Sequence, residues 1–259
     1  PLAAKIAGEV FTLNYIPVRQ KEAEADRQSM RRAMAASSGE VRLLRYADPA
    51  GKECYIRTAQ FTIFLAIRQL WPEATAKMAC TLGSSVYISV AGAKDFSAST
   101  LKARVSELVG QDIPLIRRRV KLQQAIDRFR GEGQTDKARL LSWRTADYFD
   151  EYAYGDFADY YYGEMMPSTG YLTVWDILPA DGGFVFVYPD DGNPEICAKV
   201  PPMPNFFSVY NEGERWGELM ECQTVADLND LTNSGRIREL IRVNEALHEK
   251  RFSQVADQV

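Results

Sequence analysis

The fold is organised around Glu53-Cys-Tyr-Ile-Arg-Thr-Ala-Gln-Phe-Thr-Ile-Phe-Leu-Ala-Ile-Arg-Gln-Leu-Trp71, the stretch with the strongest helical pattern in the chain. Apolar residues recur there three and four positions apart, which places them on one face of an α-helix. That face consists of Ala59, Ile63, Ala66, Ile67 and Leu70, and it is widened by Phe61, Phe64 and Leu65. The pattern predicts a largely buried helix that ends at Pro72.

The residues before this helix alternate between strand and helix patterns. We expect a hairpin at Leu2–Val18 with a turn at Gly8-Glu9, a partly exposed helix at Lys21–Ala36, a strand at Val41–Tyr46 and a turn at Asp48-Pro49-Ala50-Gly51.

The residues after the helix continue the mixture. We expect a hairpin at Ala76–Val90, a helix capped by Ser97 or Ser99 that runs through Val109, a strand at Asp112–Val120, and helices at Leu122–Phe129 and Asp136–Trp143. Further on we expect strands within Tyr148–Tyr188, a proline-rich connection at Asn193–Pro204, and helices from Phe206, broken at Gly213 and Asn233-Ser234-Gly235, with a last helix at Arg236–Gln258. Strands and helices in no regular alternation predict an α+β fold: an antiparallel sheet with packed helices, followed by a helical C-terminal segment.

Composition excludes several classes of function. The 259 residues are 46% hydrophobic and carry a formal net charge of -4, which allows one large domain or two modest ones and gives no general basic footprint for duplex DNA. The nearest basic run is Arg117-Arg118-Arg119 with Lys121, which we interpret as the solvated side of a strand.

Cysteine usage and hydropathy indicate a cytoplasmic protein with reduced thiols. Cys54, Cys80, Cys197 and Cys222 are scattered without a C-x-x-C pair, and the most apolar run, Phe61–Ile67, is too short to cross a membrane. Because the sequence opens at Pro1 in strand-like residues and closes at Val259 within a helical pattern, we expect a piece of a longer polypeptide.

Two segments resemble a known domain. Arg57–Pro72 resembles the opening helix of the editing domain of threonyl-tRNA synthetases, which is also related to part of alanyl-tRNA synthetases, and Asp156–Tyr171 resembles its second signature segment. The residues before Arg57 resemble the tail of a TGS module, a small β-grasp domain. The resemblance implies three parts: a partial TGS-like segment with a helical insert over residues 1–52, an editing-like domain over 53–204 and a helical segment over 205–259.

A bacterial family of nucleoside kinases, related to uridine kinase and phosphoribulokinase, combines the same modules ahead of a kinase domain. The chain resembles that family at Arg57-Thr58, Pro167-Ser-Thr-Gly-Tyr171, Gly217–Asp230 and Glu245–Lys250. This resemblance implies a C-terminal kinase domain as partner, with ATP and Mg²⁺ as its cofactors. The chain itself has no G-x-x-x-x-G-K-[ST] motif, so we expect no cofactor in it.

Synthetase editing sites of this type use three histidines and one cysteine. Carried over by position, the histidines fall at Thr58, at Phe61 or Thr62, and at Met165, and the cysteine falls at Tyr161. Threonine, phenylalanine and methionine neither take up a proton near neutral pH nor bind zinc as imidazole and thiolate do. We therefore expect no catalytic residue and no metal site, and we interpret the one histidine, His248, as a surface residue of a charged helix.

The remaining cleft predicts a binding function. Polar groups come from Arg57, Thr58, Asp156, Asp159, Ser168 and Thr169, apolar and aromatic ones from Phe61, Tyr161 and Met165, and Lys137 matches a nearby helix position in the relatives. Such a site suits a nucleoside, a nucleotide or a tRNA-like ligand. Strand tyrosines also serve as packing residues, and Lys137 also fits an exposed helix position.

Three functional hypotheses stay open on the sequence. The first is a non-catalytic, ligand-binding or regulatory N-terminal module of an ATP-dependent, uridine-like nucleoside kinase. The second is a hydrolase of aminoacyl-tRNA or nucleotide esters that works through Asp159 or Lys137. The third is a purely structural or dimerising role. Asp156 and Asp159, three apart in an expected strand, project to opposite faces and form no carboxylate pair unless a turn intervenes.

Overall fold

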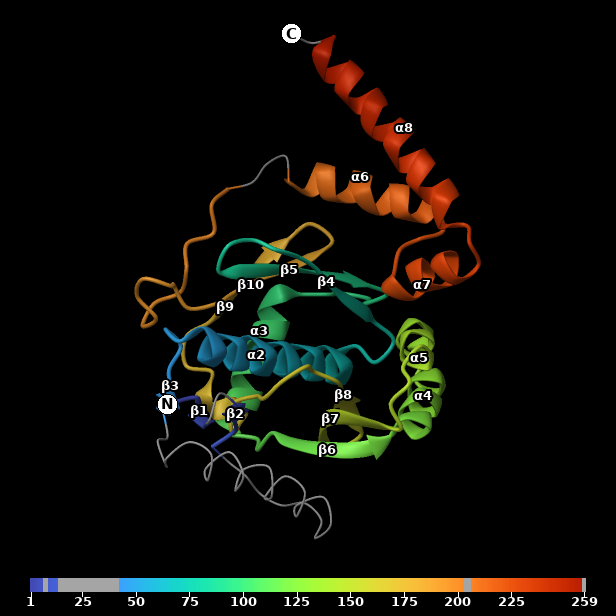
Figure 1. The fold of residues 1–259 in the computed structure, drawn as a ribbon. Helices are drawn as coiled ribbons and strands as arrows, with labels where there is room; N and C mark the ends of the chain where they lie inside the picture. Colours follow the sequence, from blue (N-terminus) through green and yellow to red (C-terminus); the bar gives the residue numbers. More distant parts are fainter. Residues whose placement is uncertain (7–8, 14–41, 203–205, 258–259) are drawn as a thin grey trace. The chain divides into compact units, whose positions relative to one another are not determined.

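The computed structural model describes residues 1–6, 9–13, 42–202 and 206–257 (Figure 1). The chain divides into two compact units, which are described separately. Unit 1 comprises Pro1–Arg119 and Asp150–Pro202, and unit 2 comprises Val120–Phe149 and Met203–Val259. The predicted helix at Lys21–Ala36 and the predicted turn residue Gly8 lie outside the described residues. The three domains implied by the resemblance stay predictions.

Helix α2 (Pro49–Leu70) is the central element of unit 1. It begins four residues before the predicted start, so the expected turn at Asp48–Gly51 is wrong. Proline is well suited to the first helical turn, because its missing N–H needs no partner there. Half of the 22 residues of α2 are buried, and they face in several directions around the helix. The helix therefore serves as the axis of the core, as its apolar pattern predicted.

The largest sheet of unit 1 has four strands in the order β4-β5-β10-β9, paired antiparallel. The strands are β4 (Thr75–Thr81), β5 (Ser85–Ala91), β9 (Asp176–Ala180) and β10 (Gly183–Val187). The predicted hairpin at Ala76–Val90 is confirmed as β4 and β5. Helix α3 (Ala98–Gly110) follows this hairpin, and Ser97 accepts a hydrogen bond from the amide of Thr100 at 3.4 Å, which identifies Ser97 as the cap.

Two smaller three-stranded sheets complete the described strands. The first has the order β2-β1-β3, and the second has the order β6-β7-β8. Their members are β1 (Ala3–Ile6), β2 (Glu9–Phe11), β3 (Arg42–Leu44), β6 (Ile116–Lys121), β7 (Tyr148–Tyr154) and β8 (Phe157–Asp159). Strand β6 begins four residues later than predicted, because Pro114 and the residues beside it pair with the loop at 167–169 instead. The described residues thus form a mixed α+β fold with antiparallel pairing, as predicted.

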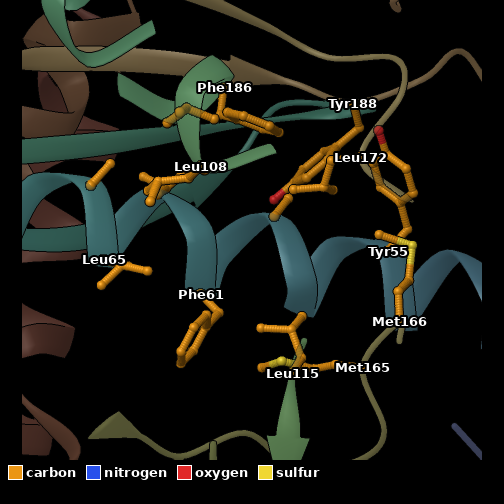
Figure 2. Close-up of a cluster of buried hydrophobic side chains, with 14 of the residues drawn as sticks. Tyr55, Phe61, Leu65, Leu108, Leu115, Met165, Met166, Leu172, Phe186 and Tyr188 are labelled. Carbon is orange, nitrogen blue, oxygen red and sulfur yellow. The ribbon is translucent and has the colours of Figure 1, made fainter. Parts of the chain in front are cut away.

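One hydrophobic core joins these elements of unit 1 (Figure 2). Phe186 and Tyr188 approach α2 from one side, while Phe61 and Met165 lie on the other side of the helix. Ala3 and Leu44 of the first small sheet belong to the same core.

Each arginine of the basic run pairs with a carboxylate. Arg117 lies 2.5 Å from Glu164, Arg118 lies 2.7 Å from Glu151, and Arg119 lies 2.8 Å from Asp150. Because their charges are matched one by one within the sheet, these residues form no basic patch.

Apart from the end of β6 and the start of β7, the regular elements described in unit 2 are helices: α4 (Leu122–Gly131), α5 (Thr135–Ser142), α6 (Phe206–Leu219), α7 (Val225–Asn233) and α8 (Ile237–Ala256). The predicted break at Gly213 is wrong, since α6 continues through it, and a single glycine costs a helix only about 1 kcal/mol. The break around Gly235 is confirmed, with a φ of 77° at that residue. None of the helices described is both long and apolar enough to cross a membrane.

Candidate functional site

Three of the four predicted editing positions lie in the core of unit 1. Thr58, Phe61 and Met165 are each 0% exposed. The hydroxyl of Thr58 accepts a hydrogen bond from the backbone amide of Met166 at 2.9 Å. The neighbouring Thr62, the other residue considered for the second histidine position, is also buried and donates to the carbonyl of Thr58 at 2.8 Å. These side chains pack the helix against the segment that carries Met165.

A polar network also holds the segment that carries Glu164 and Met165. The guanidinium Nε of Arg57 donates to the carbonyl of Glu164 at 3.0 Å, and its Nη1 lies 3.2 Å from Glu53. Tyr152 donates to the Glu164 carboxylate at 3.2 Å and accepts from the amide of Met165 at 3.1 Å. Burial raises the pKa of the Tyr152 phenol, so this hydroxyl keeps its proton.

The hydroxyls of Ser168 and Thr169 are engaged within the fold. Ser168 donates to Asp112. Thr169 donates to the carbonyl of Leu108 at 2.6 Å and accepts from the amide of Ile113 at 2.9 Å. These bonds tie the end of α3 to the 3-10 turn η1 (Thr169–Tyr171). The predicted contact of both hydroxyls with a ligand stays a prediction.

The predicted carboxylates occupy different environments. Asp156 is exposed in the two-residue turn between β7 and β8, where Gly155 has a φ of 56°. The turn that the prediction allowed for is therefore present between the two aspartates, and Asp156 does not project from a strand. Asp159 is buried at the end of β8, and its carboxylate accepts from the amide of Tyr160 at 2.9 Å.

Two further predicted residues lie in unit 2. The ammonium of Lys137, on α5, is 5.5 Å from the centre of the Phe129 ring. His248 is exposed on α8 beside Phe252, as predicted. Across the part of the chain that the structure describes, no three His, Cys, Asp or Glu side chains gather closely enough to hold a metal ion.

Tyr161, the residue at the cysteine position, is half-buried and packs edge-on against Phe61, with ring centres 6.3 Å apart. Its hydroxyl is buried and has no hydrogen-bond partner among the described residues. Burial raises the pKa of this phenol well above its ordinary value, and the charges of Asp159 and Tyr188 raise it further.

Tyr188 is a site residue that the sequence reading missed. It follows β10, and Figure 2 shows its hydroxyl directed at α2. This hydroxyl is also buried without a partner in the described chain. Gln60 approaches closely enough to lower the pKa of the Tyr188 phenol, although burial has the larger effect and raises it, and no hydrogen bond of regular geometry forms. The alternation of Phe184, Phe186 and Tyr188 along the strand was the available signal, since it points all three to one face.

Comparison with known proteins gives distant relatives. No protein-family model matches the chain. It is 25% identical over 209 residues to the threonine–tRNA ligase of Halorhodospira halophila, which is 79% of this chain and 31% of the relative. For the threonine–tRNA ligase of Teredinibacter turnerae the identity is 29% over 141 residues, or 53% of this chain and 22% of the relative. For the threonine–tRNA ligase of Verminephrobacter eiseniae the identity is 28% over 202 residues, which is 76% of this chain and 30% of the relative.

The chain is distantly similar to part of these synthetases. It spans less than a third of the length of each of the three relatives. The predicted resemblance to threonyl-tRNA synthetases is confirmed at this level. The three relatives give no support to the predicted nucleoside-kinase context.

Proposed function

We propose that unit 1 is an editing-domain-like module that binds a nucleoside-like or aminoacyl-nucleoside ligand without hydrolysing it. One observation carries the proposal: the side chains at the positions equivalent to the synthetase histidines are buried packing residues. Thr58 and Met165 hold two segments of the core together, and Phe61 fills the space between α2 and β8. The β1–β3 sheet represents, on this proposal, the partial β-grasp module.

The chemistry of these groups supports binding over turnover. Ester hydrolysis near neutral pH needs a general base with a pKa near 7 or a metal-bound water. The Tyr161 phenol has its pKa raised by burial, so it does not act as a base under those conditions. Glu164 is paired with Arg117. The Cys54 thiol lies beside Arg57 on the same helix, and burial raises its pKa, so it stays protonated near neutral pH.

Calorimetry on the 259-residue chain tests the proposal. We expect saturable binding of a member of a panel of uridine, adenosine, their 5′-monophosphates and tRNA, with the ligand recovered unchanged. If no compound of the panel gives a heat of binding, while circular dichroism shows that the chain is folded, the result would count against a binding function.

The hydrolase alternative makes the opposite prediction. It requires turnover of an aminoacyl-tRNA ester that is lost in Asp159→Asn or Lys137→Ala. The burial of Asp159, and its use as an acceptor for the Tyr160 amide, argue against this role.

The wider context that we propose rests on the family resemblance. In that context the module regulates, or positions substrate for, a cytoplasmic ATP- and Mg²⁺-dependent nucleoside kinase domain in the same polypeptide. The sequence that follows Val259 in the gene tests this directly. We expect a glycine-rich turn that ends in Lys-Ser or Lys-Thr, and a continuation without one would contradict the kinase context.

A further inference from the structure

Two buried hydroxyls of unit 1 lack hydrogen-bond partners among the described residues. They belong to Tyr161 and Tyr188, which lie 27 positions apart in the sequence. The phenol of Tyr188 raises the pKa of Tyr161 electrostatically, so the two groups share one environment. A buried hydroxyl without a partner is unfavourable, and native proteins pair almost all such groups with protein, water or ligand.

One stripe of α2 is only partly buried. Glu53, Arg57, Gln60, Phe64 and Arg68 recur along the helix at intervals of three and four residues and are half-buried or exposed. Gln60 on this stripe approaches the Tyr188 hydroxyl, and Tyr161 itself is half-buried. Gln60 therefore links this partly exposed stripe to the buried Tyr188 hydroxyl.

The charges around the two hydroxyls favour an uncharged ligand. Asp159 is close enough to influence Tyr161. Arg57 forms an ion pair with Glu53, and Arg117 forms one with Glu164. A phosphate near Tyr161 would thus be repelled by the Asp159 carboxylate, while the guanidinium groups of Arg57 and Arg117 are already in ion pairs.

Aromatic rings pack against both tyrosines. Phe61 packs against Phe157 and Tyr161, and Phe186 packs against Tyr188 at 5.2 Å. Such rings suit a planar ring system, and neutral hydroxyls suit its oxygen acceptors.

We propose that Tyr161 and Tyr188 form a pair of hydrogen-bond donors for the oxygen acceptors of a neutral nucleoside, with Gln60 as the third polar contact. This inference rests on the proposed function and deepens it, because it names the ligand class and the residues that recognise it. Tyr188 and Gln60 thereby join the predicted Tyr161 as binding residues.

Three phenylalanine variants separate this role from packing. Tyr161→Phe and Tyr188→Phe remove unpaired hydroxyls, so the free protein should keep its Tm or gain up to about 4 °C. Tyr55→Phe is the control: Tyr55 is as buried as Tyr188, but its hydroxyl donates to the carbonyl of Val174 at 2.7 Å and accepts from the amide of Val174 at 3.2 Å. This control should lower the Tm.

Binding of uridine and adenosine is then measured by calorimetry for each folded variant. We expect Tyr161→Phe and Tyr188→Phe each to lower the affinity for the bound nucleoside by about tenfold, which corresponds to the loss of one good hydrogen bond. Tyr55→Phe should leave this affinity unchanged. The 5′-monophosphate should bind no more tightly than its nucleoside.

The possible failures are distinguishable. Equal nucleoside affinity in wild type, Tyr161→Phe and Tyr188→Phe would overturn the donor pair and leave the binding function standing. A monophosphate that binds tenfold more tightly would overturn the neutral ligand class. A wild-type chain that binds no member of the panel would overturn the proposed function and the donor pair together. A Tm lowered in both phenylalanine variants as much as in Tyr55→Phe would show that the hydroxyls have structural partners, which also contradicts the inference.

Discussion

Thr58 shows at the scale of one residue how the site differs from a catalytic one. Its hydroxyl is buried and accepts a hydrogen bond from the Met166 amide, which joins α2 to the segment after β8. A histidine at this position would need space that Met166 and the neighbouring core residues now fill. The residue therefore contributes to the stability of the fold, which can be measured.

Thr58→Val keeps the shape of the side chain but leaves the buried Met166 amide without an acceptor. We expect a loss of about 1 to 3 kcal/mol in the free energy of unfolding, measured from urea denaturation. Thr62→Val is the control, because its hydroxyl donates to a carbonyl of the same helix that already has a helical partner. An equal loss in the two variants would contradict the bridging role of Thr58.

Individual site residues were the features that the sequence predicted least completely. It found Thr58, Phe61, Tyr161 and Met165 as positions without histidine or cysteine, because residue type alone decides that question. It did not find Tyr188, because an aromatic residue at the end of an apolar strand has the pattern of a packing residue. Only the burial of its hydroxyl distinguishes it, and burial depends on tertiary structure.

At the scale of elements, periodic patterns predicted α2, the β4–β5 hairpin and α3 correctly. The errors fell at positions where tertiary contacts outweigh local preference. The expected turn at Asp48–Gly51 became the first turn of α2, and Gly213 did not interrupt α6. Gly51 is a position where such a contact demands glycine, because a Cβ there would collide with the carbonyl of Arg45.

Gly51→Ala should accordingly destabilise unit 1 although alanine is the better helix former. We expect a loss of about 1 to 3 kcal/mol, since the clash is with backbone that cannot easily move. Gly131→Ala is the matched control in α4, where an added Cβ meets nothing within 4 Å, and it should be neutral or stabilise by up to about 1 kcal/mol. Thermal denaturation of both variants measures the difference, and a stabilising Gly51→Ala would contradict the close approach.

Helix α7 of unit 2 gives a pH-dependent prediction. Burial raises the pKa of Asp227, but hydrogen bonds from Thr224 and Arg139 and from the amides of Thr224 and Gln223 outweigh it and hold the pKa below 3.8. Asp227 and Thr224 form the capping box of α7. A carboxylate with a depressed pKa in the folded state stabilises the protein above pH 4, and this contribution disappears as the pH falls through that lower pKa.

Asp227→Asn should therefore cost about 1 kcal/mol at pH 7 and less at pH 3, because the Asp227 carboxylate becomes protonated as the pH falls through its lowered pKa. Urea denaturation followed by circular dichroism at the two pH values measures the difference. Asp230→Asn is the control, because Asp230 also pairs with Arg139 but takes no part in the cap. A cost for Asp227→Asn that is the same at both pH values would show that its charge is not involved.

At the scale of the whole molecule, the chain is distantly similar to part of threonyl-tRNA synthetases, and we propose that its four editing positions carry other side-chain types. The similarity to the synthetases extends over 53 to 79% of the chain in the three relatives described. The α+β class followed from the mixture of patterns, whereas the grouping into two units depends on contacts between distant segments and had no local signal.

The central claim is that this framework binds but does not hydrolyse. Its most direct test is the rate at which the 259-residue chain releases the amino acid from seryl-tRNA at neutral pH, compared with buffer alone. The account predicts the same rate in both samples, because no described group at the four positions serves as a general base or binds a metal. Release well above the buffer rate that disappears in Asp159→Asn would contradict it.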